Sequence, residues 1–327
     1  MKLFAQTALE KYYKPESDAG QPIPSYLLWV FTWAGRAQFV DEEPFFSIYN
    51  NPHNTPYVWQ HEYIESLMAK ATDRDWDGWT TYGRADALAC ALEKFSVSGK
   101  DVVVYGTEKP WVEAIALAAG ASSVTTVEYS PIVSEYPGLN AMHPVTLAER
   151  VLNGTSPKWN VAMSYSSLEH SGLGRYGDRL NAFGDVEELQ RMSCLLGKGD
   201  LLFLGLPVGS DQLVSNHHRV YGPHRLALLT AGWKFLAAFE ENGTQIDHRH
   251  DLWQLEWRQP VMVFQNEQLN APCHSEPAFV LDKGDSGAKH QTAAFRIART
   301  RNAGAPNPQG RCLWWLIGLD TIYNVVH

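Results

Sequence analysis

The chain of 327 residues is 45% hydrophobic and 19% charged, a composition that fits a globular protein with a buried core and excludes a largely disordered chain. Its 27 basic and 36 acidic residues give a formal net charge of −9. This charge repels phosphate backbones and anionic lipids, so we expect no nucleic-acid partner. The apolar residues 26–34 are too few to cross a bilayer, so we expect no membrane span in this chain.

The organisation expected along the chain is a central domain between two less regular parts. Residues 1–98 combine aromatic and proline-rich stretches with helical spacing at 63–71 and 83–95, and are interpreted as an N-terminal helical and aromatic cover. Residues 99–266 form the main domain, and residues 267–327 are expected to be a C-terminal appendage that packs on this core. No feature of the sequence indicates an oligomeric state.

The sequence is compatible with two cellular compartments. Asn153 and Asn242 each begin an Asn-Gly-Thr sequon, although Asn-Gly is also an ordinary turn dipeptide. The chain is expected to be soluble, in the cytoplasm or, if a missing segment directs it there, in the lumen of the secretory pathway.

The central domain alternates predicted strands and helices. An apolar β-branched run at 101–105, a helix at 110–119 and a strand at 123–128 predict a β-α-β unit. A strand and a helical turn are expected within 143–152, and a helix at 185–196 begins at Asp185, with Glu188 as its capping-box partner. The remaining expected elements are strands at 159–165, 201–206, 233–239 and 260–265, and a helix at 224–231. This alternation predicts an α/β fold with a mostly parallel sheet.

A nucleotide-type cofactor site is expected where the first two strands end. Gly106 follows the first strand, and Glu128 closes the second strand 22 positions later, where a carboxylate can accept hydrogen bonds from ribose hydroxyls. A dinucleotide needs further glycines in this loop, but Glu108 and Trp111 occupy those positions and oppose a pyrophosphate. S-adenosylmethionine has a ribose, no phosphate and a cationic sulfonium, and it tolerates such a loop. The expected cofactor-binding residues are Tyr105, Gly106, Thr107, Trp111, Glu128, Tyr129, Ser166, Ser167 and Leu168.

Three segments carry a family resemblance. The first combines the loop from Gly106 to Pro110-Trp111-Val112-Glu113 with the end of the next strand, Thr126-Val127-Glu128-Tyr129. The second is the run SSLEHSGLGRYGD at 166–178, and the third is the run NHHRVYGPHRL at 216–226. Over about residues 80–265 the chain resembles a little-characterised eukaryotic methyltransferase-like family catalogued as a domain of unknown function. The turn and strand at 195–203 also look like those of class I methyltransferases.

The resemblance implies a Rossmann-like class I methyltransferase sheet in the order 3-2-1-4-5-7-6, with an antiparallel seventh strand and helices on both faces. It also implies S-adenosylmethionine as the cofactor, with S-adenosylhomocysteine as its product. The acceptor that it suggests is a sugar hydroxyl of a glycan, with fucose as the leading example.

The reacting groups are sought after the fourth and fifth strands. Methyl transfer to an alcohol needs a group that removes the proton, and His170 is the favoured base because it follows the fourth strand. His218 and Asp178 are the competing catalytic residues. The candidate substrate-binding residues are Glu169, Arg175, Tyr176, Asn216, His217, Arg219, Tyr221 and Arg225. The arginines among them could equally pair with Asp178 or Asp211 to order the loops.

Other functions stay open at this point. A divalent metal could acidify the hydroxyl, but the spacing of the acids and histidines is not diagnostic, and a metal is not favoured. The acceptor could be a small natural product or a protein side chain instead of a sugar. The domain could also be a catalytically degenerate Rossmann binding module.

Overall fold

The computed structural model describes residues 22–41 and 55–267, apart from positions 81, 83, 177 and 257. The chain divides into the compact units Met1–Cys273 and His274–His327, and every described residue belongs to the first unit. The predicted appendage therefore lies outside the described residues beyond position 267. Within the described ranges, no helix combines the length and the apolar character that crossing a bilayer requires.

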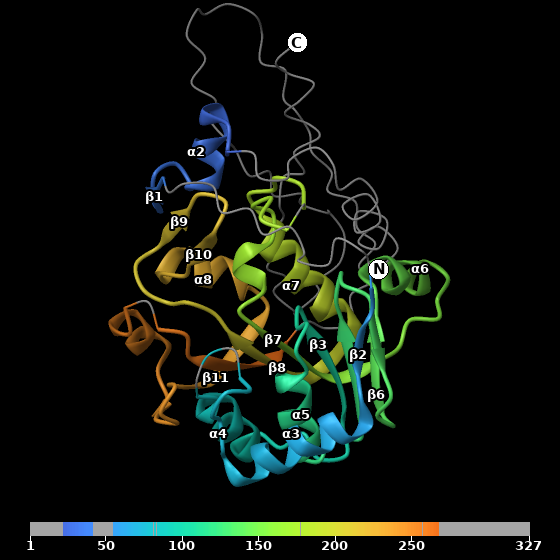
Figure 1. Ribbon diagram of the computed structural model, residues 1–327. Coiled ribbons are helices and arrows are strands. Elements are labelled where there is room, and N and C mark those ends of the chain that lie inside the picture. The colour runs from blue at the N-terminus through green and yellow to red at the C-terminus, as the bar shows by residue number, and fades with distance from the viewer. Residues whose placement is uncertain are drawn as a thin grey trace, which may run out of the picture. The chain divides into compact units, whose positions relative to one another are not determined.

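An eight-stranded sheet forms the centre of the described unit (Figure 1). Its strands lie in the order β12-β11-β13-β8-β7-β3-β4-β6, and β13 runs antiparallel to both of its neighbours. When the strands are numbered along the domain from β3 and the edge strand β12 is left aside, this order is 3-2-1-4-5-7-6 with a reversed seventh strand. The predicted Rossmann-like sheet is thus confirmed. The strands are β3 (Asp101–Tyr105), β4 (Ser123–Val127), β6 (Leu139–Met142), β7 (Trp159–Tyr165), β8 (Leu196–Gly205), β11 (Trp233–Phe239), β12 (Gln245–Ile246) and β13 (Val261–Asn266).

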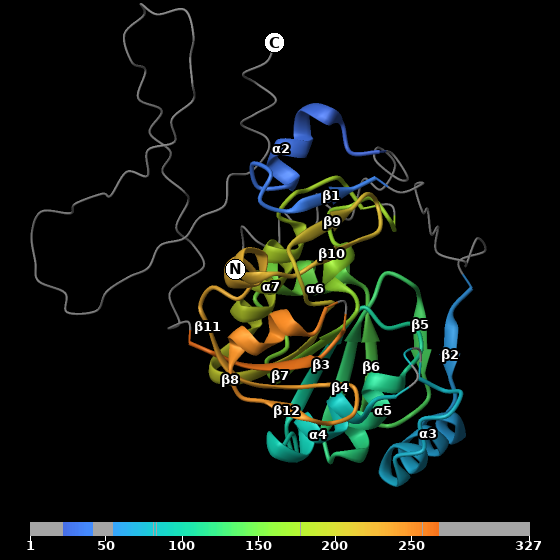
Figure 2. The same ribbon diagram turned by 90° about the vertical axis from the view of Figure 1, so that its left-hand side faces the viewer.

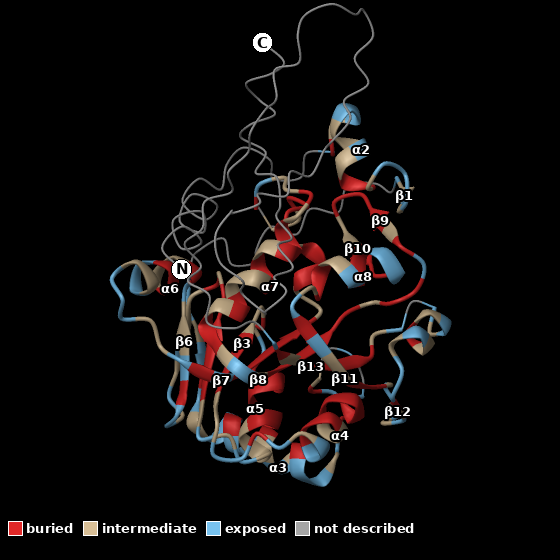
Figure 3. Cartoon of the chain, turned by 180° about the vertical axis from the view of Figure 1, so that it is seen from behind, coloured by how far each residue is buried: buried red, intermediate tan, exposed pale blue. Residues whose placement is uncertain are grey.

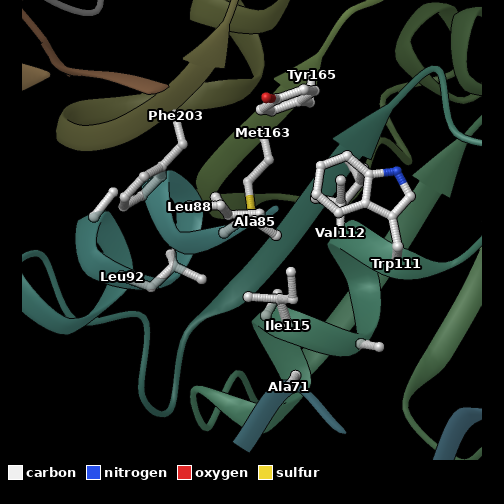
Figure 4. Close-up of a cluster of buried hydrophobic side chains, with 14 of the residues drawn as sticks. Ala71, Ala85, Leu88, Leu92, Trp111, Val112, Ile115, Met163, Tyr165 and Phe203 are labelled. Carbon is white, nitrogen blue, oxygen red and sulfur yellow. The ribbon is translucent and has the colours of Figure 1, made fainter. Parts of the chain in front are cut away.

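Helices cover both faces of this sheet (Figures 1 and 3). On one face lie α3 (His61–Asp73), α4 (Asp86–Lys94) and α5 (Trp111–Ala118), and on the other lies α7 (Gly184–Leu195); α6 (Pro144–Leu152) and α8 (Pro223–Leu229) complete the unit. The core between α3–α5 and the sheet is apolar and closely packed, with Leu88, Ile115, Met163 and Phe203 all buried (Figure 4). Burial of such side chains stabilises each by about 1.5–3 kcal/mol, so this core holds the strand ends rigidly in place.

The part of the predicted N-terminal cover that the structure describes makes two small parallel pairings of its own. Strand β1 (Gln38–Val40) pairs with β9 (Gln212–Val214), which also pairs antiparallel with β10 (His218–Val220) (Figure 2). Strand β2 (Tyr57–Trp59) pairs with β5 (Ile132–Ser134). Before β1 come the short helices η1 (Ser25–Leu27) and α2 (Leu28–Phe31), and the further short helices η2 (Leu168–His170) and η3 (Arg249–Gln254) lie in later loops.

Two local predictions were wrong. The strand expected within 143–152 ends at Met142, because His143 caps α6: its Nδ1 accepts a hydrogen bond from the Val145 amide at 3.2 Å. The predicted capping box of α7 is absent, since this helix follows Phe183 without a side-chain cap. The carboxylate of Asp185 is instead held by Arg225, which offers a stronger, charged partner than a backbone amide.

Candidate functional site

The carboxyl ends of four neighbouring strands meet at one edge of the sheet. Tyr105 at the end of β3 is in register with Val127 of β4 and with Ser164 of β7, and Tyr165 is in register with Gly205 of β8. The loops that leave these strands therefore begin side by side, which brings Gly106, Glu128 and Ser166 to one place. This is the edge at which open α/β sheets bind their ligands.

Gly106 makes the first of these loops possible. Its φ of +79° lies in the left-handed region, and an added Cβ would overlap the side chain of Ser167 in the loop after β7. The two loops thus approach each other more closely than any side chain larger than hydrogen allows at position 106. This close approach fixes the loop after β3 against the loop after β7.

Glu128 is buried directly after β4. Its Oε1 accepts hydrogen bonds from the backbone amides of Tyr129 at 2.6 Å and Ser130 at 3.3 Å. Burial raises the pKa of Glu128 to about 7, against the two amide bonds, and the nearby Glu108 and Glu113 raise it further. Its Oε2 makes no hydrogen bond within the described ranges, so one carboxylate oxygen stays available to a ligand.

Glu113, which ends the motif Pro110-Trp111-Val112-Glu113 and was not among the predicted site residues, lies in the first turn of α5. Its carboxyl group is fully buried and accepts hydrogen bonds from the hydroxyls of Thr107 and of Thr126, the latter at 2.6 Å. Burial raises the pKa of Glu113 to about 7, although both threonine bonds act in the opposite direction. This acid ties the loop after β3 to strand β4. The available signal was a single acid in the otherwise apolar run 111–119.

Glu169 and His170 form a buried pair in η2, after β7. The Glu169 carboxylate accepts a hydrogen bond from the Ser166 hydroxyl at 2.6 Å, and its Oε1 lies 3.6 Å from His170 Nε2. Its other oxygen is buried without a partner among the described residues. Burial raises the pKa of Glu169 to about 7, and it lowers the pKa of His170, beside Arg175, to about 3.

The backbone of the next loop fixes the orientation of the His170 ring. His170 Nδ1 lies 2.5 Å from the carbonyl oxygen of His217 and 3.2 Å from Arg175 Nη1. A carbonyl only accepts and a guanidinium only donates, and the shorter contact favours a proton on Nδ1. Arg175 Nη1 donates to the same carbonyl at 3.2 Å. Nε2 is therefore the nitrogen that can accept a proton, and it faces Glu169.

The loop after β8 lies beside the buried pair Glu169 and His170. The hairpin β9–β10 turns through Asn216, which is fully buried and has a φ of +55°. The ring of His218 lies 6.4 Å from that of His170, and the ring of His217 lies 5.9 Å from that of His218. The competing base His218 therefore lies near His170, with His217 beside it. The Tyr176 ring meets the His170 ring edge to face at 5.5 Å, and Arg175 lies over Tyr176 at 5.3 Å.

Three of the predicted substrate-binding residues belong to a buried ionic network around Asp185. Arg225 donates to Asp185 through Nε at 3.0 Å and through Nη2, and the Tyr221 hydroxyl donates to it at 2.9 Å. Arg219 Nε lies 3.8 Å from the same acid, and its Nη1 donates to the Ser171 carbonyl at 2.6 Å. Burial alone would raise the pKa of Asp185, but the two arginines hold it below its ordinary value. These side chains are engaged within the protein and order the loops.

The remaining predicted site residues lie in the loop after β7 and directly after β4. Asp178 is a loop-ordering group, since it accepts hydrogen bonds from the backbone amides of Gly172 at 2.5 Å and Tyr176 at 3.4 Å. Leu168 is buried in η2, and Tyr129 lies after β4 with its ring 6.3 Å from that of His143.

Within residues 22–41 and the described part of 55–267, no three His, Cys, Asp or Glu side chains are grouped to hold a metal.

Tyr82, which was not among the predicted site residues, also lies at the carboxyl edge of the sheet. Tyr82 packs on Trp111, with ring centroids 6.1 Å apart, and on Tyr165 at 5.0 Å. Its hydroxyl is hydrogen-bonded to the Ser166 side chain, and burial raises the pKa of Tyr82 to about 12. No periodic pattern surrounds position 82, so only its place in the fold reveals it.

Comparison with solved structures finds similar folds at low identity. The chain is similar to the 1,6-didemethyltoxoflavin-N1-methyltransferase of Burkholderia thailandensis, solved with S-adenosylhomocysteine, at 17% identity and a TM-score of 0.39, over 65% of this chain and 93% of that one. It is also similar to the N-methyltransferase NodS of Bradyrhizobium japonicum, at 11% identity and a TM-score of 0.37, over 56% of this chain and 93% of that one. No curated protein matches the sequence.

The family itself is identified by sequence. The profile of a family described as "Caenorhabditis protein of unknown function, DUF268" matches residues 99–264. This range contains the loop at Gly106, the run at 166–178 and the run at 216–226, so the predicted resemblance to a family of unknown function is confirmed. The chain belongs to the DUF268 family.

Proposed function

We propose that this protein is an S-adenosylmethionine-dependent methyltransferase that acts on a sugar hydroxyl. The observation that carries the proposal is the free oxygen of Glu128 beside the Gly106 loop, at the carboxyl edge of a 3-2-1-4-5-7-6 sheet. A carboxylate in this position accepts hydrogen bonds from the two hydroxyls of a ribose. Gly106 lets the loop after β3 pack against Ser167, which fixes the backbone of this loop beside Glu128.

The charges at this edge favour a cationic cofactor over a pyrophosphate. Glu108 and Glu113 lie close enough to Glu128 to raise its pKa, and the Ser130 hydroxyl donates to Glu108 at 2.7 Å. A dinucleotide would bring two phosphate charges next to these acids, at a cost of several kcal/mol for close like charges. When bound, S-adenosylmethionine supplies a methyl group that the positive charge on its sulfur has already activated.

His170 is proposed as the group that takes the proton of the acceptor hydroxyl. The contact of Nδ1 with the His217 carbonyl leaves Nε2 as the proton acceptor. Burial lowers the pKa of His170 to about 3, which keeps the imidazole neutral at pH 7 but weakens it as a base. The imidazolium that forms would be stabilised by the Glu169 carboxylate 3.6 Å away. Proton removal of this kind contributes about 10²- to 10⁴-fold to a reaction rate.

The sugar acceptor rests on the family resemblance and on the surroundings of His170. Tyr176 places an aromatic ring next to the imidazole, Arg175 lies over that ring, and His218 lies near the imidazole. This combination of an aromatic face with hydrogen-bonding groups suits a neutral sugar ring. Fucose at the end of a glycan is the proposed acceptor.

Transfer of tritium from methyl-labelled S-adenosylmethionine tests the proposal directly. The acceptor panel contains fucosylated glycans, the same glycans without fucose, peptides and nucleic acids. We expect label only in the fucosylated glycans, with a single methyl mass increment in mass spectrometry. Labelling confined to peptides or nucleic acids would show that the acceptor is not a sugar. The absence of any cofactor binding would reject the proposal that the protein is a methyltransferase.

A further inference from the structure

Three aromatic rings from separate elements meet at the carboxyl edge of the sheet. Tyr82 precedes α4, Trp111 begins α5, and Tyr165 ends β7. Trp111 and Tyr165 lie with their ring centroids 4.9 Å apart at 82°, above the apolar core in Figure 4, and are only 3% and 7% exposed. Tyr82 covers both of them and is 41% exposed, so it alone offers an accessible ring from this cluster.

The accessible ring lies between the loop after β3, which the proposed function assigns to the cofactor, and the loop after β7, which carries the proposed base. Trp111, beneath it, follows the Gly106 loop, and Ser166, hydrogen-bonded to the Tyr82 hydroxyl, begins the loop after β7. The Ser166 hydroxyl in turn donates to Glu169. Packing against two rings fixes the plane of Tyr82, and the hydrogen bond fixes its tip, so the ring face is preorganised.

The charges around this ring also suit a cation. Glu169 and Arg175 act on Tyr82 with opposite signs, while Glu108 lies in the loop after β3, Glu113 lies in the first turn of α5 and Glu128 follows β4. The face of a tyrosine ring attracts cations through its quadrupole. A positively charged ligand group is therefore favoured over a neutral one of the same shape.

We propose that the face of Tyr82 binds the sulfonium of S-adenosylmethionine by a cation–π contact and so distinguishes this cofactor from its uncharged product. The proposal rests on the proposed function. Methyl transfer moves the carbon from sulfur to the acceptor oxygen, the C–S bond pair returns to sulfur, and the hydroxyl proton passes to the base. Sulfur is then a neutral thioether, so the contact with Tyr82 weakens and product release becomes easier. Tyr82 would contact the cofactor directly, and its loss should raise KM for the cofactor with little loss of kcat.

Calorimetric titration of S-adenosylmethionine and S-adenosylhomocysteine against three variants tests this role. Tyr82→Leu keeps apolar bulk but removes the ring, and we expect it to lower the affinity for S-adenosylmethionine about 3- to 30-fold more than that for S-adenosylhomocysteine. Tyr82→Phe keeps the ring and should change the ratio of the two affinities less than about twofold. Tyr63→Leu is the matched control, because Tyr63 is 42% exposed on α3 and should leave both affinities unchanged.

A fluorinated phenylalanine series at position 82 provides a second measurement that does not depend on the stability of the leucine variant. Successive fluorines weaken the ring quadrupole at nearly constant size, so the affinity for S-adenosylmethionine should fall stepwise while that for S-adenosylhomocysteine stays constant. Equal changes for the two compounds, or no change for either, would overturn the role of Tyr82 alone. A wild-type protein that binds neither compound would overturn the proposed function, and the cation site with it.

Discussion

The Cα of Gly106 lies so close to the side chain of Ser167 that a Cβ at position 106 would come within 2.5 Å of Ser167 Cβ and overlap its hydroxyl. This contact joins the loop after β3 to the loop after β7. The left-handed φ of +79° adds a second reason for glycine, since other residues adopt this conformation at a cost.

Gly106→Ala should therefore destabilise the protein by about 2–4 kcal/mol, through overpacking and backbone strain together, and abolish cofactor binding. The matched control is Gly154→Ala, because Gly154 has a φ of +73° with no atom within 4 Å of an added Cβ. It should cost only about 1 kcal/mol. Urea unfolding measures both, and Ser167→Gly should restore part of the loss in the Gly106→Ala background. Equal costs at the two glycines would contradict the close contact.

Glu128→Ala should weaken binding of S-adenosylhomocysteine by about 1.5–3 kcal/mol, the usual loss for a charged hydrogen-bond acceptor. Titration calorimetry measures this, with the exposed Glu135→Ala as a control that should bind like the wild type. NAD should not bind to any of the three proteins. Undiminished affinity in the Glu128 variant, or preferential binding of NAD, would remove the assignment of the ribose contact.

Glu113→Gln should flatten the dependence of stability on pH. The pKa of Glu113 is raised from 4.5 to about 7, so the folded state holds a proton that the unfolded state has released between these values. This contribution to stability is complete below pH 4.5 and is lost as pH rises through 7. It amounts to roughly 3 kcal/mol. Chemical unfolding from pH 4.5 to 8 should show a smaller decline in the glutamine variant.

The control for Glu113 is the exposed Glu149→Gln, whose stability should follow the wild-type decline. Glu128 and Glu169 have raised pKa values as well, so a residual decline is expected in every variant. Parallel curves for the wild type and the Glu113 variant would mean that this carboxyl group does not titrate in the folded protein over the range.

His170→Ala should lower single-turnover methyl transfer about 10²- to 10⁴-fold while the cofactor still binds. The same substitution at His217 or His218 should cost less, and His250→Ala should cost nothing because this side chain is 74% exposed. Rapid-quench measurement of labelled product, with calorimetry as the test of folding, decides between them. Near wild-type transfer in the His170 variant with a collapse in the His218 variant would move the base to the β9–β10 hairpin.

Asp185→Asn should destabilise the protein by about 3–5 kcal/mol, because it leaves the buried Arg219 and Arg225 without their shared counter-charge. Thermal and urea unfolding measure this loss. The exposed Asp247→Asn provides the control and should change stability by less than about 0.5 kcal/mol. A loss of substrate affinity at unchanged stability would instead mark the network as a binding site.

The strands at 101–105, 159–165 and 233–239 could be predicted to the residue, since short apolar runs between turn residues in a β-α-β pattern have few alternatives. The positions of Gly106 and Glu128 followed from the same pattern. Both are local consequences of a strand that ends at a known point.

Long-range pairings could not be predicted in this way. Asp185 has the sequence signature of a helix cap, but a guanidinium 40 positions away binds it, and only the fold brings the two together. In the sequence Glu113 resembles a solvent-facing acid, but in the fold it is buried against strand β4. Tyr82 lies in a segment without periodicity. Such residues depend on tertiary neighbours that no local pattern encodes.

The parallel pairing of β1 with β9 gives the protein two separately variable parts. Residues 38–40 lie outside the range 99–264 that defines the family, yet they support the hairpin that carries His217 and His218. Mutations in this strand can shift the imidazoles without altering Gly106, Glu128 or any other family position. Relatives with different N-terminal segments would therefore keep the same cofactor chemistry and diverge in what they modify, so acceptor choice should follow the sequence before position 99.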